Sequence, residues 1–194
     1  MAAPLTIGLT GGIAAGKSEA LAAFQRLGAA TISSDAVVHE LLDCEPLLGL
    51  LVERWGEGVA PAGKVDRGKV GEIVFADPRQ LSWLEEQIHP LVGERIGARL
   101  SALPEGTEVA VVEVPLLFEA EMEKVFDTTV AIVTADGLRR ERAEARGHTL
   151  VAEREARQLS QSEKAARAEH VVANDGSLED LERHLSELLD KLRG

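Results

Sequence analysis

Short apolar runs alternate with helix-prone stretches along the 194 residues of the chain. A short apolar run bounded by turn residues is typical of a buried strand, and apolar residues recurring every three or four positions are typical of a helix. Their alternation favours an α/β fold, in which helices cover both faces of a parallel sheet. The predicted strands are residues 5–9, 29–33, 108–113, 128–134 and 170–173.

The clearest helix lies at the end of the chain. Ser177 and Asp180 have the spacing of a capping box, in which each side chain bonds the backbone N–H of the other. Leucines then recur at helical spacing, which predicts a helix packed on the sheet. These leucines are Leu178, Leu181, Leu185, Leu188 and Leu192.

Two segments depart from the alternation. Residues 37–103 are long and helical, and residues 136–167 are helical and densely charged. Ligands of nucleotide-binding α/β folds bind outside the carboxyl ends of the strands, where such insertions lie. We therefore interpret 37–103 as a substrate-binding region and 136–167 as a lid, with a core of about 1–36, 104–135 and 168–194. Helix breaks inside the first segment are predicted at Pro46, 56–63, Pro78 and Pro90.

Composition narrows the class of protein. The chain has 21 Lys and Arg against 33 Asp and Glu, a net charge of −12, which argues against nucleic acid or an anionic membrane as a partner. Its single cysteine, Cys44, permits no intrachain disulfide and is in keeping with a reducing compartment. We expect a cytoplasmic protein without a signal peptide or membrane span, and a monomer or weak homo-oligomer.

The most specific motif directly follows the first predicted strand and precedes a helix-prone stretch. Residues 11–18 fit the phosphate-binding pattern Gly-x4-Gly-Lys-Ser. Glycines let backbone N–H groups converge on an anion, the lysine reaches the outer phosphates and the serine hydroxyl is suited to Mg²⁺. A bland glycine-rich turn has no need of Lys and Ser at these two spacings. The loop consists of Gly11, Gly12, Ile13, Ala14, Ala15, Gly16, Lys17 and Ser18.

Two carboxylates follow predicted strands. Asp35 comes just after the second strand, where it is suited to take a proton from an attacking hydroxyl, and also suited to cap the next helix. Glu113 ends the third strand, where an acidic residue holds Mg²⁺ or its waters, or simply faces solvent. The residues alone leave both alternatives open at both positions.

A local cationic stripe stands out in this acidic chain. Arg139, Arg142 and Arg146 are spaced i, i+3, i+7 and so share one face of a helix, with Arg140 beside them. The stripe could close over a triphosphate and neutralise charge in phosphoryl transfer. The alternative is a solvated helix, in which Glu141 and Glu144 pair with these arginines.

Other enzyme signatures are absent from the sequence. It has no Cys/His cluster for zinc, no Gly-x-Ser-x-Gly elbow of a serine hydrolase, and no Asn/Thr-Lys-x-Asp motif of a guanine-specific GTPase. His89 is followed by Pro90, which is expected to end the preceding helix. From the residues alone, His89 is more readily a packed histidine than a catalytic one.

An ordered set of motifs resembles the dephospho-coenzyme A kinases over nearly the whole chain. Beyond the loop and Asp35, the matching segments follow in the family's order. They are Asp66-Arg67 with Val74-Phe75, Ile88-His89-Pro90-Leu91-Val92, Val114-Pro115-Leu116-Leu117-Phe118-Glu119, Arg142 with Arg146, and Gln158 with Lys164 and Ala168 before Asn174.

The resemblance implies a P-loop kinase fold, a three-layer sandwich with a five-stranded parallel sheet, a helical acceptor-binding domain and a lid. It implies ATP-dependent phosphorylation of the ribose 3′-hydroxyl of dephospho-coenzyme A, with Mg²⁺. Asp35 would be the general base, and Lys17 and Arg142 would stabilise the transferring group. Ser18 would bind Mg²⁺, with Glu113 acting through water, and Glu19, Arg146 and Asn174 would join the loop in binding ATP. Besides Asp35, the acceptor would be bordered by Arg67, His89, Leu116, Leu117 and Glu119.

The chain departs from the family pattern at four places. Ala14-Ala15 replaces Gly-Ser or Gly-Ala, and we expect Ala14 to keep a negative φ. Ser33 replaces the first Asp of Asp-x-Asp, so Asp35 would carry the base role alone. Glu19 replaces a small residue near the phosphates, and Glu169 replaces an Asp.

Two alternative functions remain at the level of sequence. One is a kinase of the same fold that acts on a nucleoside or a nucleoside monophosphate, against which the His-Pro and Pro-Leu-Leu-Phe-Glu segments argue. The other is a nucleotide-dependent binding module without turnover. Asp35 together with the arginine stripe argues against it, because a pure binder needs no base.

Overall fold

The computed structural model describes residues 3–145 and 158–193. The chain divides into two compact units. The first consists of Met1–Ser33 and Leu103–Gly194, and the second of Ser34–Ala102. Each unit is described by itself.

The first unit is built on a five-stranded sheet in the order β2-β3-β1-β4-β5, in which every pairing is parallel. All five predicted strands are therefore confirmed, with ends that differ by at most two residues, and so is the α/β fold class. The strands are β1 (Leu5–Gly11), β2 (Ala30–Ser33), β3 (Val109–Glu113), β4 (Thr128–Val133) and β5 (His170–Ala173).

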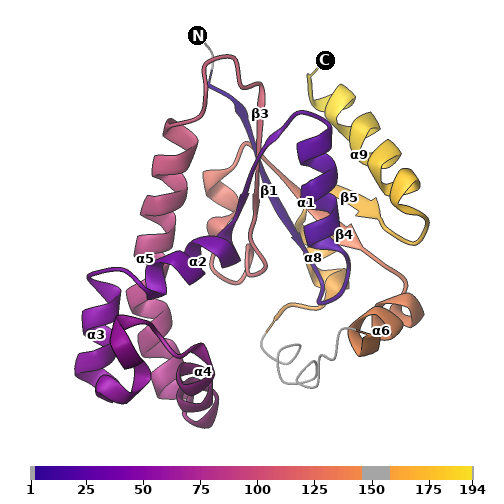
Figure 1. Cartoon of the computed structure of the whole chain (residues 1–194). Helices are drawn as coiled ribbons and strands as arrows, with labels where there is room; N and C mark the ends of the chain where they lie inside the picture. The colour runs from indigo at the N-terminus through magenta and orange to yellow at the C-terminus, as the bar shows by residue number, and fades with distance from the viewer. Residues whose placement is uncertain (1–2, 146–157, 194) are drawn as a thin grey trace. The chain divides into compact units, whose positions relative to one another are not determined.

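Helices α1 and α9 lie side by side on one face of this sheet (Figure 1), and α8 packs against β1 and β4. The loop that precedes α1 and the start of α6 lie at the same end of the sheet (Figure 1). This follows from the parallel pairing, because the carboxyl ends of all the strands meet at one edge. The described helices of the unit are α1 (Lys17–Arg26), η3 (Met122–Val125), α6 (Asp136–Ala145), α8 (Gln161–Arg167) and α9 (Leu178–Arg193).

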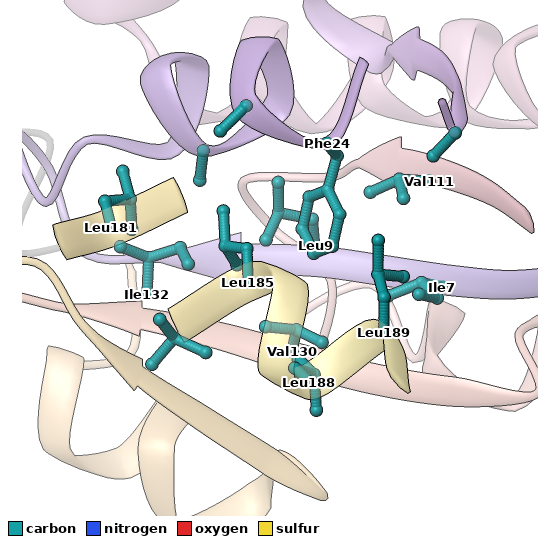
Figure 2. Close-up of a cluster of buried hydrophobic side chains, with 14 of the residues drawn as sticks. Ile7, Leu9, Phe24, Val111, Val130, Ile132, Leu181, Leu185, Leu188 and Leu189 are labelled. Carbon is teal, nitrogen blue, oxygen red and sulfur yellow. The ribbon is translucent and has the colours of Figure 1, made fainter. Parts of the chain in front are cut away.

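The core of the unit lies between the sheet and the α1–α9 layer (Figure 2). Phe24 of α1 and Leu185 of α9 are fully buried, as are Ile7 and Leu9 of β1. Every residue of β3 is buried, as expected for a parallel strand that is covered on both faces. Burial of this continuous apolar surface holds β1, and therefore the loop that follows it, in a fixed place.

The start of α9 shows the predicted capping box. The backbone N–H of Ser177 donates to Asp180 Oδ2 over 3.1 Å, and the backbone N–H of Asp180 donates to Ser177 Oγ over 3.1 Å. The hydrogen bonds from Ser177, helped by Arg183, lower the pKa of Asp180 to about 2. The predicted apolar stripe is wrong at one position: Leu178 is 58% exposed, because the first helical residue lies outside the packed cluster, whereas Leu189 is buried in it.

The second unit is helical. Two 3₁₀ turns, η1 (Glu57–Val59) and η2 (Pro61–Gly63), follow α3 and account for the break predicted at 56–63. The prediction that Pro90 ends a helix is wrong, because Pro90 lies inside α5. Glu86, His89 and Pro90 are all exposed, so the carbonyl that loses its N–H partner lies on the solvent side of the helix. The α-helices are α2 (Ser34–Leu42), α3 (Leu47–Trp55), α4 (Arg67–Ala76) and α5 (Pro78–Ser101).

Among the described residues, no helix combines the length and the apolar character needed to cross a membrane.

The contrast between two leucines of α9 gives a test of the packing. Leu185→Ala removes a fully buried side chain and should lower the free energy of unfolding by about 3 kcal/mol. Leu178→Ala, on the same helix but exposed, should change it by no more than about 0.5 kcal/mol. Urea unfolding of both variants measures the difference, and equal losses would contradict the assignment of this face of α9 to the core.

Candidate active site

The glycine-rich loop connects β1 to α1. Gly16 has φ 92° and directly precedes Lys17, the first residue of α1. A Cβ on Gly16 would lie 2.1 Å from Asn174 Nδ2, and one on Gly11 would lie 2.5 Å from the carbonyl oxygen of Ile132. These two positions therefore exclude any larger residue, because β4 and Asn174 approach the loop backbone directly.

Ala14 does not keep the expected negative φ. Its φ is 59°, in the left-handed region, so this expectation is wrong. Successive backbone N–H groups converge on one point when right-handed and left-handed residues alternate, and an anion-binding loop requires that geometry. The shape of the loop thus overrides the preference of alanine, at a cost of about 1 kcal/mol.

Lys17 lies over the loop. Its Nζ donates to the carbonyl oxygens of Gly11 and Gly12 over 3.2 and 3.0 Å. These contacts keep the ammonium group at the mouth of the loop, where a phosphate oxygen would compete with the two carbonyls. This placement is suited to binding the outer phosphates of a nucleotide.

Ser18 and Glu19 lie in the first turn of α1. Ser18 is exposed, so its hydroxyl is accessible to a ligand. The carboxylate of Glu19 lies 3.7 Å from Arg26, which also pairs with Glu182 over 2.7 Å. The negative charge of Glu19 is therefore partly offset within its own helix.

The side chain of Asn174 lies under the loop. Its Nδ2 donates to the carbonyl oxygen of Ala15 over 2.9 Å. Its backbone N–H donates to Val133, and its own carbonyl accepts a bond from Arg142 over 3.1 Å. The predicted site residues Asn174, Arg142 and Ala15 therefore meet in one hydrogen-bonded group.

Two arginines of the predicted stripe contact other parts of the site. Arg142 is half-buried and bonds Thr134 Oγ1, over 3.4 Å, and the Asn174 carbonyl, rather than a glutamate of its own helix. Arg139 pairs with Asp136 over 3.3 Å, and its Nη1 would lie 3.4 Å from a Cβ on Gly12. The alternative of a solvated stripe is thus wrong for Arg142, whereas Arg139 pairs within its own helix and Arg140 is exposed.

The prediction that Arg146 belongs to the site concerns a residue outside the described ranges.

Glu113 ends β3, directly beside the loop-bearing strand. It is only 6% exposed and pairs in register with Leu9 of β1 and Ser33 of β2. Its carboxylate and the Ser18 hydroxyl offer hard oxygen ligands, which fit Mg²⁺. No group of three or more His, Cys, Asp or Glu suited to a metal occurs among the described residues. A Mg²⁺ ion that keeps several waters and binds phosphates needs no such cluster.

The turn after β3 is held by a buried ion pair. Lys164 of α8 is fully buried, and its Nζ lies 3.1 Å from Glu119 Oε1 and bonds the Pro115 carbonyl. Glu119 Oε1 also accepts the N–H of Leu159 over 2.8 Å. Because removing one partner of a buried ion pair is strongly unfavourable, this pair ties α8 to the turn.

The two leucines of this turn differ in accessibility. Leu116 is half-buried and offers a surface to a ligand, whereas Leu117 is fully buried. A direct acceptor contact through the Leu117 side chain is therefore not available, because the side chain packs inside the unit.

A second capping box begins α8. The Ser160 side chain accepts the N–H of Glu163, and Glu163 accepts from Ser160 in return. These bonds from Ser160 lower the pKa of Glu163. Gln161 follows Ser160. Its Oε1 accepts the N–H of Thr134 and its Nε2 donates to the carbonyl of Thr134, both over 2.9 Å.

Three predicted site residues lie in the second unit, and all are exposed. Asp35 lies within the first turn of α2, which begins at Ser34, so the alternative that Asp35 is the helix cap is wrong. Arg67 is the first residue of α4, after the cap Asp66. His89 lies in the middle of α5.

Sequence reasoning did not single out Thr134 or Gln161, and it assigned Lys164 no role. Thr134 follows an apolar strand and Gln161 follows a helix cap, which are ordinary places for polar residues. Their signal exists only in three dimensions, since Thr134 lies 119 residues after Ala15, whose carbonyl it bonds.

The left-handed alanine generates a prediction. Ala14→Gly should raise the free energy of unfolding by about 1 kcal/mol, because glycine adopts positive φ without strain. The same change at Ala22, inside α1, should lower it by about 1 kcal/mol. Chemical denaturation of both variants is the measurement, and loss of stability in Ala14→Gly would contradict the strained backbone.

Comparisons with known proteins identify the family of the chain. The family model described as dephospho-CoA kinase matches residues 5–180. The dephospho-CoA kinase of Symbiobacterium thermophilum is 39% identical over 179 residues, covering 89% of this chain and 75% of the relative. That of Bacillus licheniformis is 37% identical over 192 residues, 96% of each chain. The solved structure of dephospho-CoA kinase from Campylobacter jejuni matches with a TM-score of 0.72 and 25% identity over 96% of each chain.

The family match spans both units, from the loop-bearing strand through the helical segment to the first turn of α9. The family that the ordered motifs indicated is thereby confirmed, together with the P-loop kinase fold. This chain belongs to the dephospho-CoA kinase family.

Proposed function

We propose that the protein transfers the γ-phosphoryl group of ATP to the ribose 3′-hydroxyl of dephospho-coenzyme A, giving coenzyme A and ADP. The observation that carries the proposal is the phosphate loop, with Lys17 and Arg142 beside it, in a chain of this family. Phosphoryl transfer depends mainly on positioning and on neutralising charge, and this site offers both.

The ATP side of the reaction uses the loop of residues 11–18 and the start of α1. Backbone N–H groups and the positive end of the helix bind the phosphates. Lys17 exchanges its two carbonyl partners for phosphate oxygens, and Arg142, held half-buried nearby, stabilises the transferring group. Glu19, Arg146 and Asn174 remain predicted ATP-binding residues.

Ser18 and, through water, Glu113 would hold Mg²⁺ in this proposal. When bound, the ion neutralises charge on the phosphates. The fit rests on the accessible Ser18 hydroxyl and on the place of Glu113 at the carboxyl edge of the sheet.

We assign residues 37–103 as the acceptor-binding region and 136–167 as the lid, whose last part, α8, is packed against β1 and β4. Asp35 accepts the proton of the attacking hydroxyl, a role its exposed carboxylate can fill. The acceptor would be bordered by Arg67, His89, Leu116 and Glu119; the side chain of Leu117 is buried.

The reaction involves two small-molecule substrates and neither nucleic acid nor a membrane, in keeping with the net charge of −12. We also predict that the protein is cytoplasmic and that it is a monomer or a weak homo-oligomer.

An acceptor screen tests the reaction. With ATP and Mg²⁺, the purified protein should release ADP rapidly with dephospho-coenzyme A and only at background rate with AMP, CMP or adenosine. A coupled ADP assay measures this. Turnover on AMP or CMP instead would point to a monophosphate kinase of the same fold, and ATP binding without turnover on any acceptor would favour a binding module.

The base role of Asp35 makes a separate prediction. Asp35→Asn keeps the size of the side chain but cannot accept the proton, so kcat should fall by about 10²-fold or more while the Kd for ATP stays the same. Asp190→Asn, which neutralises an exposed carboxylate on α9, is the matched control and should keep the wild-type kcat. A wild-type kcat in Asp35→Asn would reject the role.

A further inference from the structure

The Ala15 carbonyl is a point at which distant parts of the first unit contact the phosphate loop. It accepts Thr134 Oγ1 over 3.0 Å and Asn174 Nδ2 over 2.9 Å. Ala15, Thr134 and Asn174 are all buried, with exposed fractions of 0, 2 and 5%. Two donors on one buried carbonyl fix the direction in which it points.

That direction determines where the next N–H points. The peptide bond between Ala15 and Gly16 is planar, and in a trans peptide the C=O and the N–H lie on opposite sides. With the carbonyl held by Thr134 and Asn174, the Gly16 N–H is directed to the other side of the loop. A backbone N–H held in advance binds an anion without the cost of reorganisation.

Thr134 also connects this carbonyl to Arg142. The Thr134 hydroxyl has one proton, and Ala15 at 3.0 Å is a nearer acceptor than the Asn174 carbonyl at 3.3 Å. Its lone pairs accept Arg142 Nη1 over 3.4 Å, and the same Nη1 bonds the Asn174 carbonyl over 3.1 Å. The hydroxyl thus accepts from the arginine and donates to the loop, as Asn174 does through its carbonyl and its side-chain amide.

The backbone of Thr134 is itself fixed. It lies between β4 and α6, and both its N–H and its carbonyl are bonded by the side chain of Gln161 over 2.9 Å. A hydroxyl on a backbone held in this way keeps its place when a ligand enters or leaves the loop.

We propose that Thr134 is a positioning residue for nucleotide binding, which orients the Ala15–Gly16 peptide toward the phosphates and links it to Arg142. The inference rests on the proposed function only in taking ATP as the ligand of the loop. Thr134 itself touches no substrate in this proposal, and it acts through the peptide that it bonds.

Thr134→Val tests the proposal, because valine replaces the hydroxyl by a methyl group of similar size. Loss of one orienting hydrogen bond should raise both the Kd for ATP and the KM for ATP about tenfold, the factor that corresponds to one net hydrogen bond. The KM for dephospho-coenzyme A should stay at its wild-type value. Thr134→Ser, which keeps the hydroxyl, should restore ATP binding.

Thr129→Val is the matched control. Thr129 is a buried threonine of β4, the strand that Thr134 follows, and its Oγ1 accepts the N–H of Glu169, away from the loop. Its loss should lower thermal stability and leave the Kd for ATP unchanged. Isothermal titration with ATP and Mg²⁺, without acceptor, gives Kd for all variants, and steady-state assays give the two KM values.

A wild-type Kd for ATP in Thr134→Val, an equal change in Thr129→Val, or failure of Thr134→Ser to restore binding would each overturn the proposal. If Thr134→Val does not fold, Thr134→Ala removes the same hydroxyl and carries the same expectations. If the wild-type protein binds ATP but does not phosphorylate dephospho-coenzyme A, the proposed function fails, and the comparison of Kd values still decides the role of Thr134.

Discussion

The parallel pairing of β1 with a strand on each side is the constraint on which the rest of the site depends. Leu9 lies in register with Glu113 of β3, and Gly11 with Ile132 of β4. A parallel register brings the carboxyl ends of neighbouring strands to one edge, so the loop, the acidic end of β3 and Thr134 after β4 come together there. The buried apolar cluster between the sheet, α1 and α9 holds this register.

Several buried polar groups at this edge of the sheet form hydrogen bonds and ion pairs with one another. Thr134 and Asn174 bond the Ala15 carbonyl, and Lys164 pairs with Glu119 without being exposed. Buried polar groups that lack partners are costly, so such groups rigidify the backbone that they serve. The left-handed Ala14 belongs to the same arrangement, since the surroundings hold a conformation that alanine alone would avoid.

Positive side chains gather at the phosphate loop, as a kinase that binds an anionic nucleotide requires. The chain as a whole carries a net charge of −12, yet Lys17, Arg139 and Arg142 all lie beside the loop. Bonds to Gly12 and Asn174 hold two of these side chains in place before any ligand arrives. Cations placed in advance in a partly buried site stabilise phosphate charge more than mobile surface cations do.

The sequence by itself determined the five strands, the α9 capping box, the phosphate loop and the family. Each of these is written in residues close together in the chain, as short apolar runs, the Ser177–Asp180 spacing or a continuous motif. Local patterns of this kind are readable because they act through neighbouring backbone groups.

Only the tertiary structure decided the positive φ of Ala14 and the burial of Leu117. It also decided that α5 continues through Pro90 and that Thr134 and Asn174 both bond the Ala15 carbonyl. These features depend on which strands are neighbours and on which faces are covered. They join residues as far apart as Ala15 and Asn174, separated by 159 positions, so no local pattern records them. The local preference of a residue predicts its backbone conformation or its burial only where tertiary contacts do not outweigh that preference.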